Sequence, residues 1–342
     1  MVGPSTRPRP ISHVRWGIIG CGDVTEVKSG PAFSRLPDSS LVAVMRRDAG
    51  KARDYAERHG VPRWTSDADE VLLADDVDAV YVATPPSSHA EYVLRAAAAG
   101  KPVYVEKPMA ASAAEAEAMV RACDEAGVPL FVAYYRRALP RFTTVRDAIA
   151  NGEIGEPRLV TLELHVSAPQ SRERAGWRWD PGVAGGGLVM DLGSHALDLL
   201  DHWLGPIEEL HALRATRLPW AGVEDQLVAA FGFASGAQGT ATWGFNGATS
   251  RDVLTVFGSE GSVQVPVFAE GSVTLERPGA SPRAIEVPHP AHVQEPLIAL
   301  LNDALLGRGD ACPSTGVSAL RTQRLLDVLT GRDGASPPAG VG

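Results

Sequence analysis

An acid and a histidine four residues apart, directly after three glycines, are the residues of this sequence best suited to chemistry. On a helix, Asp191 and His195 would lie on one face, about one turn apart. The glycines at 185–187 would let the main chain approach a ligand closely. A carboxylate beside an imidazole at such a turn suits proton transfer to or from a bound hydroxyl group. For this segment alone, a buried helix in which the two side chains only bind each other is an equally good interpretation.

A glycine-containing turn near the start of the chain predicts a dinucleotide site. Residues 14–19 form an apolar run that leads into this turn and then into a predicted helix. Gly20 would make the tight turn, and Gly22 would let a pyrophosphate approach the start of the helix. Thr25 stands where the pattern has its third glycine, so the motif is incomplete. The predicted cofactor contacts in this turn are Gly20, Cys21, Gly22, Asp23 and Val24.

Two arginines follow the second predicted strand, residues 41–45, about twenty residues beyond the glycine turn. NAD-binding proteins place Asp or Glu at this point, whereas an arginine there accommodates the 2′-phosphate of NADP. Because a guanidinium group binds phosphate through two hydrogen bonds, Arg46 and Arg47 favour NADP as the cofactor. Asp48 could instead accept a hydrogen bond from a ribose hydroxyl, which keeps NAD as the alternative. Two solvated arginines at a strand end are the non-functional interpretation.

Strands and helices alternate through the first half of the chain. Three predicted helices end in a glycine with a proline two residues later, a pattern that stops a helix, at Gly60, Gly100 and Gly127. The apolar runs between them lack polar alternation, which is typical of a parallel sheet covered by helices on both faces. We therefore predict an α/β domain with a doubly wound parallel sheet. The runs are residues 79–83, 102–105 and 130–133.

Ligands of such a sheet lie beyond the carboxyl ends of its strands, so the residues just after each strand are candidates for a site. Lys107 could donate a hydrogen bond to a substrate oxygen and favour the alkoxide that forms as hydride moves. A surface lysine paired with Glu106 is the alternative. His89 opens a helix, where a structural role is as good an interpretation as a cofactor contact. The predicted cofactor contacts here are Thr84, Pro85, His89, Glu106, Lys107 and Arg136.

The second half of the chain has a different pattern, in which apolar and polar residues alternate along successive segments. Leu162, Leu164 and Val166 would share one face of a strand, and segments between 227 and 265 repeat the pattern. Such alternation predicts an antiparallel sheet with one covered face. Two helices are expected at 293–306 and 317–331. The uncovered face would either bind substrate or pair with another subunit, and it favours assembly into a homodimer or homotetramer.

The composition limits the classes of function. The chain has 342 residues, of which 44% are hydrophobic and 21% charged, and its formal net charge is -9. Short clusters of Lys and Arg in an acidic chain argue against a nucleic-acid partner. The three cysteines are far apart, so we expect reduced thiols and no metal site. No apolar run approaches the length of a membrane span, and we expect a cytoplasmic protein without a membrane partner.

Four of these segments, taken in order, resemble the Gfo/Idh/MocA family, which is named for glucose–fructose oxidoreductase, inositol dehydrogenase and a rhizopine-catabolism protein. They are residues 16–22, 76–85, 106–108 and 185–198. The resemblance implies an N-terminal Rossmann domain at 14–136 and an α/β domain at 137–331 with an open, mostly antiparallel sheet. Residues 1–13 and 332–342 are expected to be disordered tails.

The resemblance also implies an activity, namely hydride transfer between NAD(P) and a hydroxyl or carbonyl group of a sugar, inositol or related polyol. The lysine of the family's Glu-Lys-Pro segment matches Lys107, which would polarise the reacting oxygen and contact the cofactor. The acid and histidine of its helix match Asp191 and His195. In this interpretation His195 relays the hydroxyl proton, while Asp191 orients it or binds the substrate.

The chain departs from the family pattern after the predicted strand at residues 130–133, where Tyr135 replaces a smaller polar group. Trp177 and Arg178 precede the glycines, where the family commonly has Trp-Arg. A tryptophan face can stack on a sugar and an arginine can hold a hydroxyl, although core packing of Trp177 and Trp179 is an equal alternative. The predicted substrate contacts are Lys107, Tyr135, Trp177, Arg178, Asp191 and His195.

Two other functions stay open at this point. A glycosidase that holds NAD tightly and acts by transient oxidation and elimination would consume no free cofactor. A cofactor-binding regulator would have no turnover, but it would not need Lys107, Asp191 and His195 together.

Overall fold

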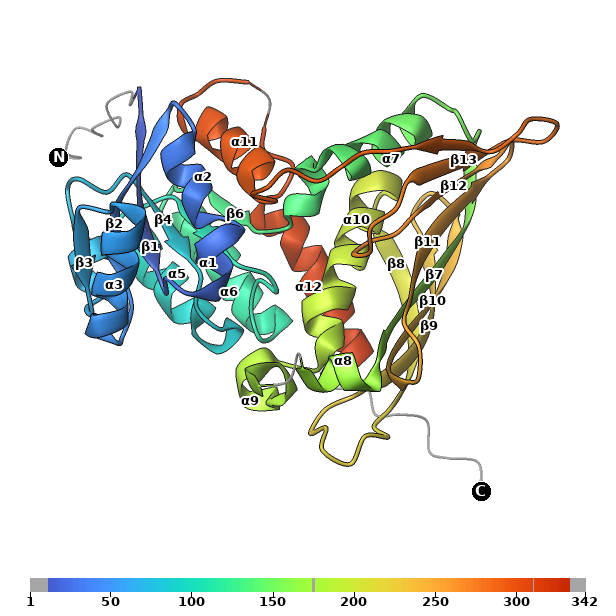
Figure 1. The fold of residues 1–342 in the computed structure, drawn as a ribbon, viewed down its shortest axis with the longest axis horizontal. Coiled ribbons are helices and arrows are strands. Elements are labelled where there is room, and N and C mark those ends of the chain that lie inside the picture. Colours follow the sequence, from blue (N-terminus) through green and yellow to red (C-terminus); the bar gives the residue numbers. More distant parts are fainter. Residues whose placement is uncertain (1–11, 174–175, 310, 333–342) are drawn as a thin grey trace.

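The computed structural model describes residues 12–173, 176–309 and 311–332, so the predicted tails lie almost entirely outside the described residues. The chain forms two lobes, each built on its own sheet, with helices between them (Figure 1). The predicted α/β class with two different sheets is confirmed.

The first sheet has six parallel strands in the order β3-β2-β1-β4-β5-β6, which is the Rossmann order. Its central strands are buried apolar runs, as the sequence predicted, with the partly exposed Arg15 of β1 as the exception. The third strand was not predicted, because its three residues, RWT, form no apolar run. The strands are β1 (Val14–Ile19), β2 (Ser39–Met45), β3 (Arg63–Thr65), β4 (Ala79–Val82), β5 (Val103–Val105) and β6 (Leu130–Val132).

Short helices connect these strands. The predicted glycine stop at Gly60 is confirmed, since this residue ends a helix with a φ of 64°, a conformation that side chains with a Cβ rarely adopt. The helices are α1 (Asp23–Val27), α2 (Gly30–Arg35), α3 (Ala49–His59), α4 (Asp69–Leu72), α5 (His89–Ala98) and α6 (Ala113–Glu125).

The second sheet has eight strands in the order β14-β13-β12-β11-β7-β10-β9-β8. All its neighbours pair antiparallel except β7 and β10, so the sheet is mostly antiparallel, as expected. The edge strand β8 was not predicted, because its charged residues break the alternation. The strands are β7 (Pro157–Ser167), β8 (Ile207–Ala215), β9 (Gln226–Phe233), β10 (Gln238–Gly247), β11 (Arg251–Gly258), β12 (Ser262–Val265), β13 (Val273–Glu276) and β14 (Arg283–Ile285).

The described helices cover one face of this sheet. Figure 1 shows α10 and α12 between the two sheets, whereas none of the described helices covers the far face of the second sheet. The helices of this half are α7 (Pro140–Ala150), α8 (Ala168–Glu173), α9 (Pro181–Ala184), α10 (Ser194–Leu204), α11 (Glu295–Leu305) and α12 (Gly316–Thr330).

The end of the chain returns to the first sheet. The Trp16 indole donates to Asn302 of α11 (2.9 Å), and the Asn302 amide donates to Ser39 (2.9 Å). The Ser314 hydroxyl, just before α12, donates to the main-chain oxygen of Val132 in β6 (2.7 Å). The last two helices therefore pack on the Rossmann sheet as well, and the predicted boundary at residue 136 stays a prediction.

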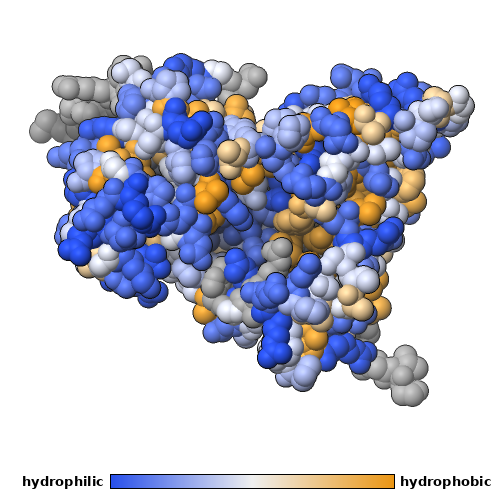
Figure 2. All heavy atoms as spheres, in the orientation of Figure 1, coloured by the Kyte–Doolittle hydropathy of each residue, from blue (hydrophilic) through white to orange (hydrophobic). Residues whose placement is uncertain are grey.

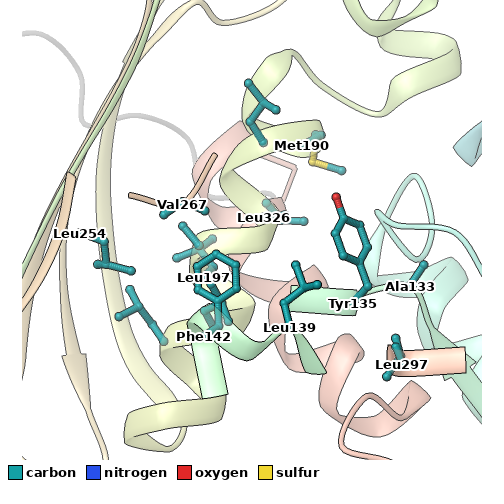
Figure 3. Close-up of a cluster of buried hydrophobic side chains, with 14 of the residues drawn as sticks. Ala133, Tyr135, Leu139, Phe142, Met190, Leu197, Leu254, Val267, Leu297 and Leu326 are labelled. Carbon is teal, nitrogen blue, oxygen red and sulfur yellow. The ribbon is translucent and has the colours of Figure 1, made fainter. Parts of the chain in front are cut away.

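A continuous apolar core fixes the two lobes to each other. Figure 3 shows Tyr135 and Leu139, which follow β6, pointing into a cluster with Leu197 of α10, Leu297 of α11 and Leu326 of α12. All five are buried. Because each such side chain stabilises the fold by about 1.5–3 kcal/mol, the cluster holds the strand ends and α10 in a fixed relation.

Candidate active site

A cleft of about 920 Å³ joins the carboxyl ends of the Rossmann strands to the second lobe. The two lobes are separated by a recess on the face drawn in Figure 2. The cleft lies where a doubly wound sheet binds its ligands, and its size suits a dinucleotide together with a small substrate. Most of the predicted site residues line it, namely Gly20, Cys21, Gly22, Asp23, Val24, Arg46, Arg47, Thr84, Pro85, Glu106, Lys107, Tyr135, Arg136, Arg178, Asp191 and His195.

The glycine turn leaves room for a phosphate group. Gly20 has a φ of 93°, and a Cβ there would meet Thr84 at 2.6 Å, so only glycine fits. Beside Gly22 the space is open, since the nearest atom to an added Cβ would be Nη1 of Arg46, 3.8 Å away. Thr25 takes the place of the third glycine by accepting a hydrogen bond from the Gly22 amide (2.9 Å). Burial raises the pKa of Cys21 to about 11, so its thiol stays neutral.

The two arginines lie on the wall of the same part of the cleft. Arg46 is half-buried and Arg47 exposed, and neither forms an ion pair with another described residue. Asp48 begins α3, where its carboxylate accepts a hydrogen bond from the Lys51 amide (3.1 Å). One carboxylate oxygen of Asp48, the alternative hydrogen-bond acceptor for the ribose, is therefore already used to cap α3.

The position of His89 corrects its prediction as a cofactor contact. The side chain is fully buried beneath the cleft and both ring nitrogens face main-chain oxygens, of Thr84 (2.7 Å) and of Pro108 (3.1 Å). His89 therefore ties the loop after β4 to the loop after β5. This is the structural role that the sequence left open for His89, but its partners could not be predicted, because they belong to two other segments.

Glu106 belongs to a buried hydrogen-bond network that the sequence did not predict. One carboxylate oxygen accepts from the Tyr81 hydroxyl (2.6 Å) and from the Gln294 amide (2.6 Å). The other accepts from the main-chain amide of Lys107 (3.1 Å), and Tyr104 donates to Gln294 (2.7 Å). Gln294 lies 188 residues from Glu106 in the chain, so no local pattern could have revealed it.

Lys107 is a partly buried ion-pair partner of Asp191 and is not a surface lysine paired with Glu106. Its ammonium group contacts the Asp191 carboxylate and also donates to the Asp191 main-chain oxygen (3.0 Å). Arg178 donates to the second carboxylate oxygen of Asp191 (2.8 Å). Burial alone would raise the pKa of Asp191, but the charges of Lys107 and Arg178 hold it well below its usual range. The acid is therefore ionised and shared by two cations.

His195 does not bind Asp191, although the sequence placed both on one helix face. Asp191 lies in a π-helical turn, Val189–Gly193, and His195 in the first turn of α10. The imidazole lies edge-on to the rings of Tyr135 (5.1 Å) and Phe268 (5.8 Å). No hydrogen bond joins it to Asp191 among the described residues, so the geometry does not support the role in which Asp191 orients His195.

The imidazole of His195 is held in its neutral form. Burial lowers its pKa well below 6.5, and the positive charges of Arg136, Lys107 and Lys28 lower it further. Its Nδ1 is buried and has no partner in the described part of the chain, while the ring lines the cleft. A neutral imidazole at this point can accept a proton from a bound hydroxyl group.

Arg136 lies beside Tyr135 and contacts the second lobe. Its Nε donates to the main-chain oxygen of Val267 (3.0 Å), and Nη1 donates to the Tyr135 hydroxyl (2.9 Å). The guanidinium lies 4.2 Å from the centre of the Phe268 ring.

Comparison with known proteins identifies the family. The family model described as "Oxidoreductase family, NAD-binding Rossmann fold" matches residues 14–134, and "GFO/IDH/MocA C-terminal domain" matches residues 142–264. The oxidoreductase P35 of Formosa agariphila is 35% identical over 94% of this chain and 99% of that protein. The chain belongs to the Gfo/Idh/MocA family.

Two further relatives indicate the range of this family. The 1,5-anhydro-D-fructose reductase of Ensifer adhaerens is 32% identical, over 90% of this chain and 93% of that protein. The WlbA dehydrogenase of Bordetella pertussis, in complex with NADH and UDP-GlcNAcA, superposes with a TM-score of 0.81. It is 28% identical, and the match covers 96% of this chain and 98% of that chain. This Gfo/Idh/MocA protein is an oxidoreductase with an NAD(P)-binding Rossmann fold, related to enzymes of sugars and polyols.

The tryptophans before the glycine triplet and possible metal ligands are the remaining candidates for site residues in this Gfo/Idh/MocA chain. The side chain of Trp177 is outside the described part of the structure. Trp179 is buried against Trp220 (5.1 Å between ring centres), which is the core-packing interpretation. Asp198, one helical turn beyond His195, binds Arg137 (2.7 Å). Across the described ranges, no three His, Cys, Asp or Glu side chains cluster as metal ligands, and no helix could span a membrane.

Proposed function

We propose that this protein transfers hydride between NADP, in preference to NAD, and a hydroxyl or carbonyl carbon of a sugar, inositol or related polyol. The observation that carries this proposal is the partly buried contact of Lys107 with Asp191 beside a neutral His195, at the strand ends of a Rossmann sheet. The family membership and the relatives named above support the substrate class.

The glycine turn and the two arginines would hold the cofactor. When bound, a nicotinamide cofactor accepts or supplies the hydride. The open space beside Gly22 suits its pyrophosphate, and Arg46, half-buried and without an ion-pair partner among the described residues, suits a 2′-phosphate. Because Asp48 caps α3, the arginines are the more available groups for the ribose end of the cofactor.

The proton and the charge on the reacting oxygen would be handled by side chains of this chain. His195 would accept the hydroxyl proton, since its pKa is lowered and it is neutral before reaction. Lys107 would donate a hydrogen bond to the same oxygen and stabilise its developing negative charge. Asp191 would hold Lys107 in place through the partly buried ion pair.

The test is a substrate panel of sugars, inositols and aryl glycosides, each supplied with NAD and with NADP. We expect reduction of the cofactor with one group of sugars or polyols, and no reduction in the Lys107→Ala variant. In the Arg46→Ala/Arg47→Ala variant, kcat/KM for NADP should fall about a hundredfold or more, because two charge-assisted contacts of about 1.5–3 kcal/mol each are lost, while NAD should change little. Arg53→Ala, on the exposed side of α3, is the matched control.

Three results would count against this proposal. Equal losses with NAD and NADP would mean that the arginines do not bind the 2′-phosphate. Release of the aglycone without cofactor reduction would identify a glycosidase. Cofactor binding without turnover of any substrate would point to a regulator.

A further inference from the structure

We infer that the substrate is a sugar acid whose carboxylate binds Arg136, in a subsite formed with the Tyr135 hydroxyl. This inference rests on the proposed function and adds the charge of the substrate to it.

The first observation is a buried charge without a counter-ion. Arg136 is only 7% exposed, and no carboxylate within the described ranges forms an ion pair with it. Its two buried neighbours differ, because Arg137 is paired with Asp198 (2.7 Å) and Arg141 with Glu270 (3.5 Å). Since burying an unpaired charge is costly, a guanidinium left in this state on the wall of a cleft indicates an anionic ligand.

The second observation is that the guanidinium is fixed in position. Nε is held by Val267, Nη1 by Tyr135, and the Phe268 ring lies against its face. Nη2 has no hydrogen-bond partner among the residues that the structure describes. The Tyr135 hydroxyl accepts from Arg136, so its own proton is available to a ligand. The subsite therefore offers two donors, one of them charged, without further ordering of the side chain.

The third observation is the sign of the charge around the reacting end of the cleft. Lys28, Lys107 and Arg136, which line the cleft, act on His195, and Arg178 binds Asp191 beside Lys107. Asp191 is already shared by Lys107 and Arg178, and Glu106 is bound by Tyr81 and Gln294. The field at His195 is correspondingly positive, since the three cations that act on it all lower its pKa. A neutral polyol would leave this charge uncompensated, whereas a carboxylate would balance part of it.

The experiment compares substrates that differ in one charge. The probes are D-glucuronate and D-galacturonate, their uncharged carboxamides, and glucose and galactose, each with NADP and the full chain. We expect the acid to exceed its amide in kcat/KM by about ten- to a hundredfold, the range of a charge-assisted contact. In Arg136→Met this ratio should fall to about one, and in Arg136→Lys part of it should remain. Arg121→Met, an exposed position on α6, is the matched control.

A second variant and a binding measurement test the anion subsite even if Arg136→Met does not fold or no substrate is turned over. If Arg136→Met does not fold, Tyr135→Phe retains the ring, removes only the hydroxyl and should lower the acid-to-amide ratio severalfold. Calorimetric titration of the cofactor-loaded protein with glucuronate reports binding without turnover. Turnover of neutral sugars with no preference for the acid would overturn the inference and leave the proposed function intact. Loss of NADPH affinity without loss of the acid preference in Arg136→Met would assign this arginine to the cofactor and also overturn it.

Two more outcomes separate the inference from the function on which it rests. If glucuronate binds, Arg136→Met abolishes that binding and no sugar is turned over, the anion subsite is supported and the proposed oxidoreductase activity fails. If the corresponding sugar phosphates are preferred to both acids, the anion is a phosphate and the carboxylate assignment is wrong.

Discussion

The surroundings of His195 determine the pH range in which it can accept a proton from the substrate. Its pKa is lowered by burial first and by three nearby cations second, so the ring is neutral well below pH 6.5. Oxidation of a hydroxyl group requires this neutral form, and the rate should fall only as pH drops through the lowered pKa. The cations thus extend the pH range in which the imidazole accepts a proton.

We expect the acid limb of kcat/KM for oxidation to lie below pH 6.5 and to move upward in Lys28→Met. Removing a positive charge stabilises the imidazolium form, which raises the pKa of His195. The measurement is a pH profile from about pH 4.5 to 8, the range in which a histidine titrates. A limb at or above pH 6.5, or one that Lys28→Met leaves in place, would show that His195 does not control it.

At the scale of elements, a buried ion network joins the segment after β6 to α10 and α12. Arg137 binds Asp198 through two hydrogen bonds of 2.7 Å, and Arg321 binds Asp201 through bonds of 2.8 and 2.7 Å. Asp198 and Asp201 are almost fully buried. Because α10 carries His195 one helical turn from Asp198, this network sets where the imidazole lies in the cleft.

Arg137→Met should therefore lower the free energy of unfolding by about 3–5 kcal/mol, because it leaves Asp198 buried without its partner. The double variant Arg137→Met/Asp198→Leu should recover much of this loss, since neither charge is then buried alone. Denaturant unfolding of the single and double variants measures both effects. Arg146→Met, at an exposed site on α7, is the control, and a loss of equal size there or a purely additive double variant would contradict the network.

At the scale of the whole molecule, the uncovered face of the second sheet exposes apolar side chains that no described helix covers. Leu213 of β8 and Val228 of β9 are directly opposite each other on this face, 73% and 45% exposed. Leu159 and Phe257 form a second exposed apolar pair, between β7 and β11. Rows of exposed apolar side chains on a regular sheet are typical of an interface between subunits.

We expect a homodimer or homotetramer that is held together by this face. Leu213→Glu/Val228→Glu should shift the protein to monomers, because four like charges would meet across each twofold contact. Light scattering coupled to size-exclusion chromatography gives the mass. Leu73→Glu, equally exposed on the Rossmann lobe, should not change it. A monomeric wild-type protein, or an unchanged oligomer in the double variant, would refute the assignment of this face.

The sequence by itself determined the elements and the motifs that they carry. The strand Val14–Ile19, the turn at Gly20 and the helix stop at Gly60 follow from short-range rules on apolar runs and positive φ. The position of Lys107 just after a predicted strand correctly placed this residue in the cleft. These predictions succeeded because neighbouring residues alone fix the backbone there.

Only the tertiary structure decided which side chains meet. Asp191 binds Lys107, 84 residues away, and not His195 four residues along the same segment. Gln294 donates to Glu106, which lies 188 residues away in the chain. His89 binds main-chain oxygens in the loops after β4 and β5. Such pairs depend on how the chain returns to the first sheet after the second lobe is complete. The spacing of residues along one helix cannot specify them, because buried charges and polar groups take the partner that packing brings within reach.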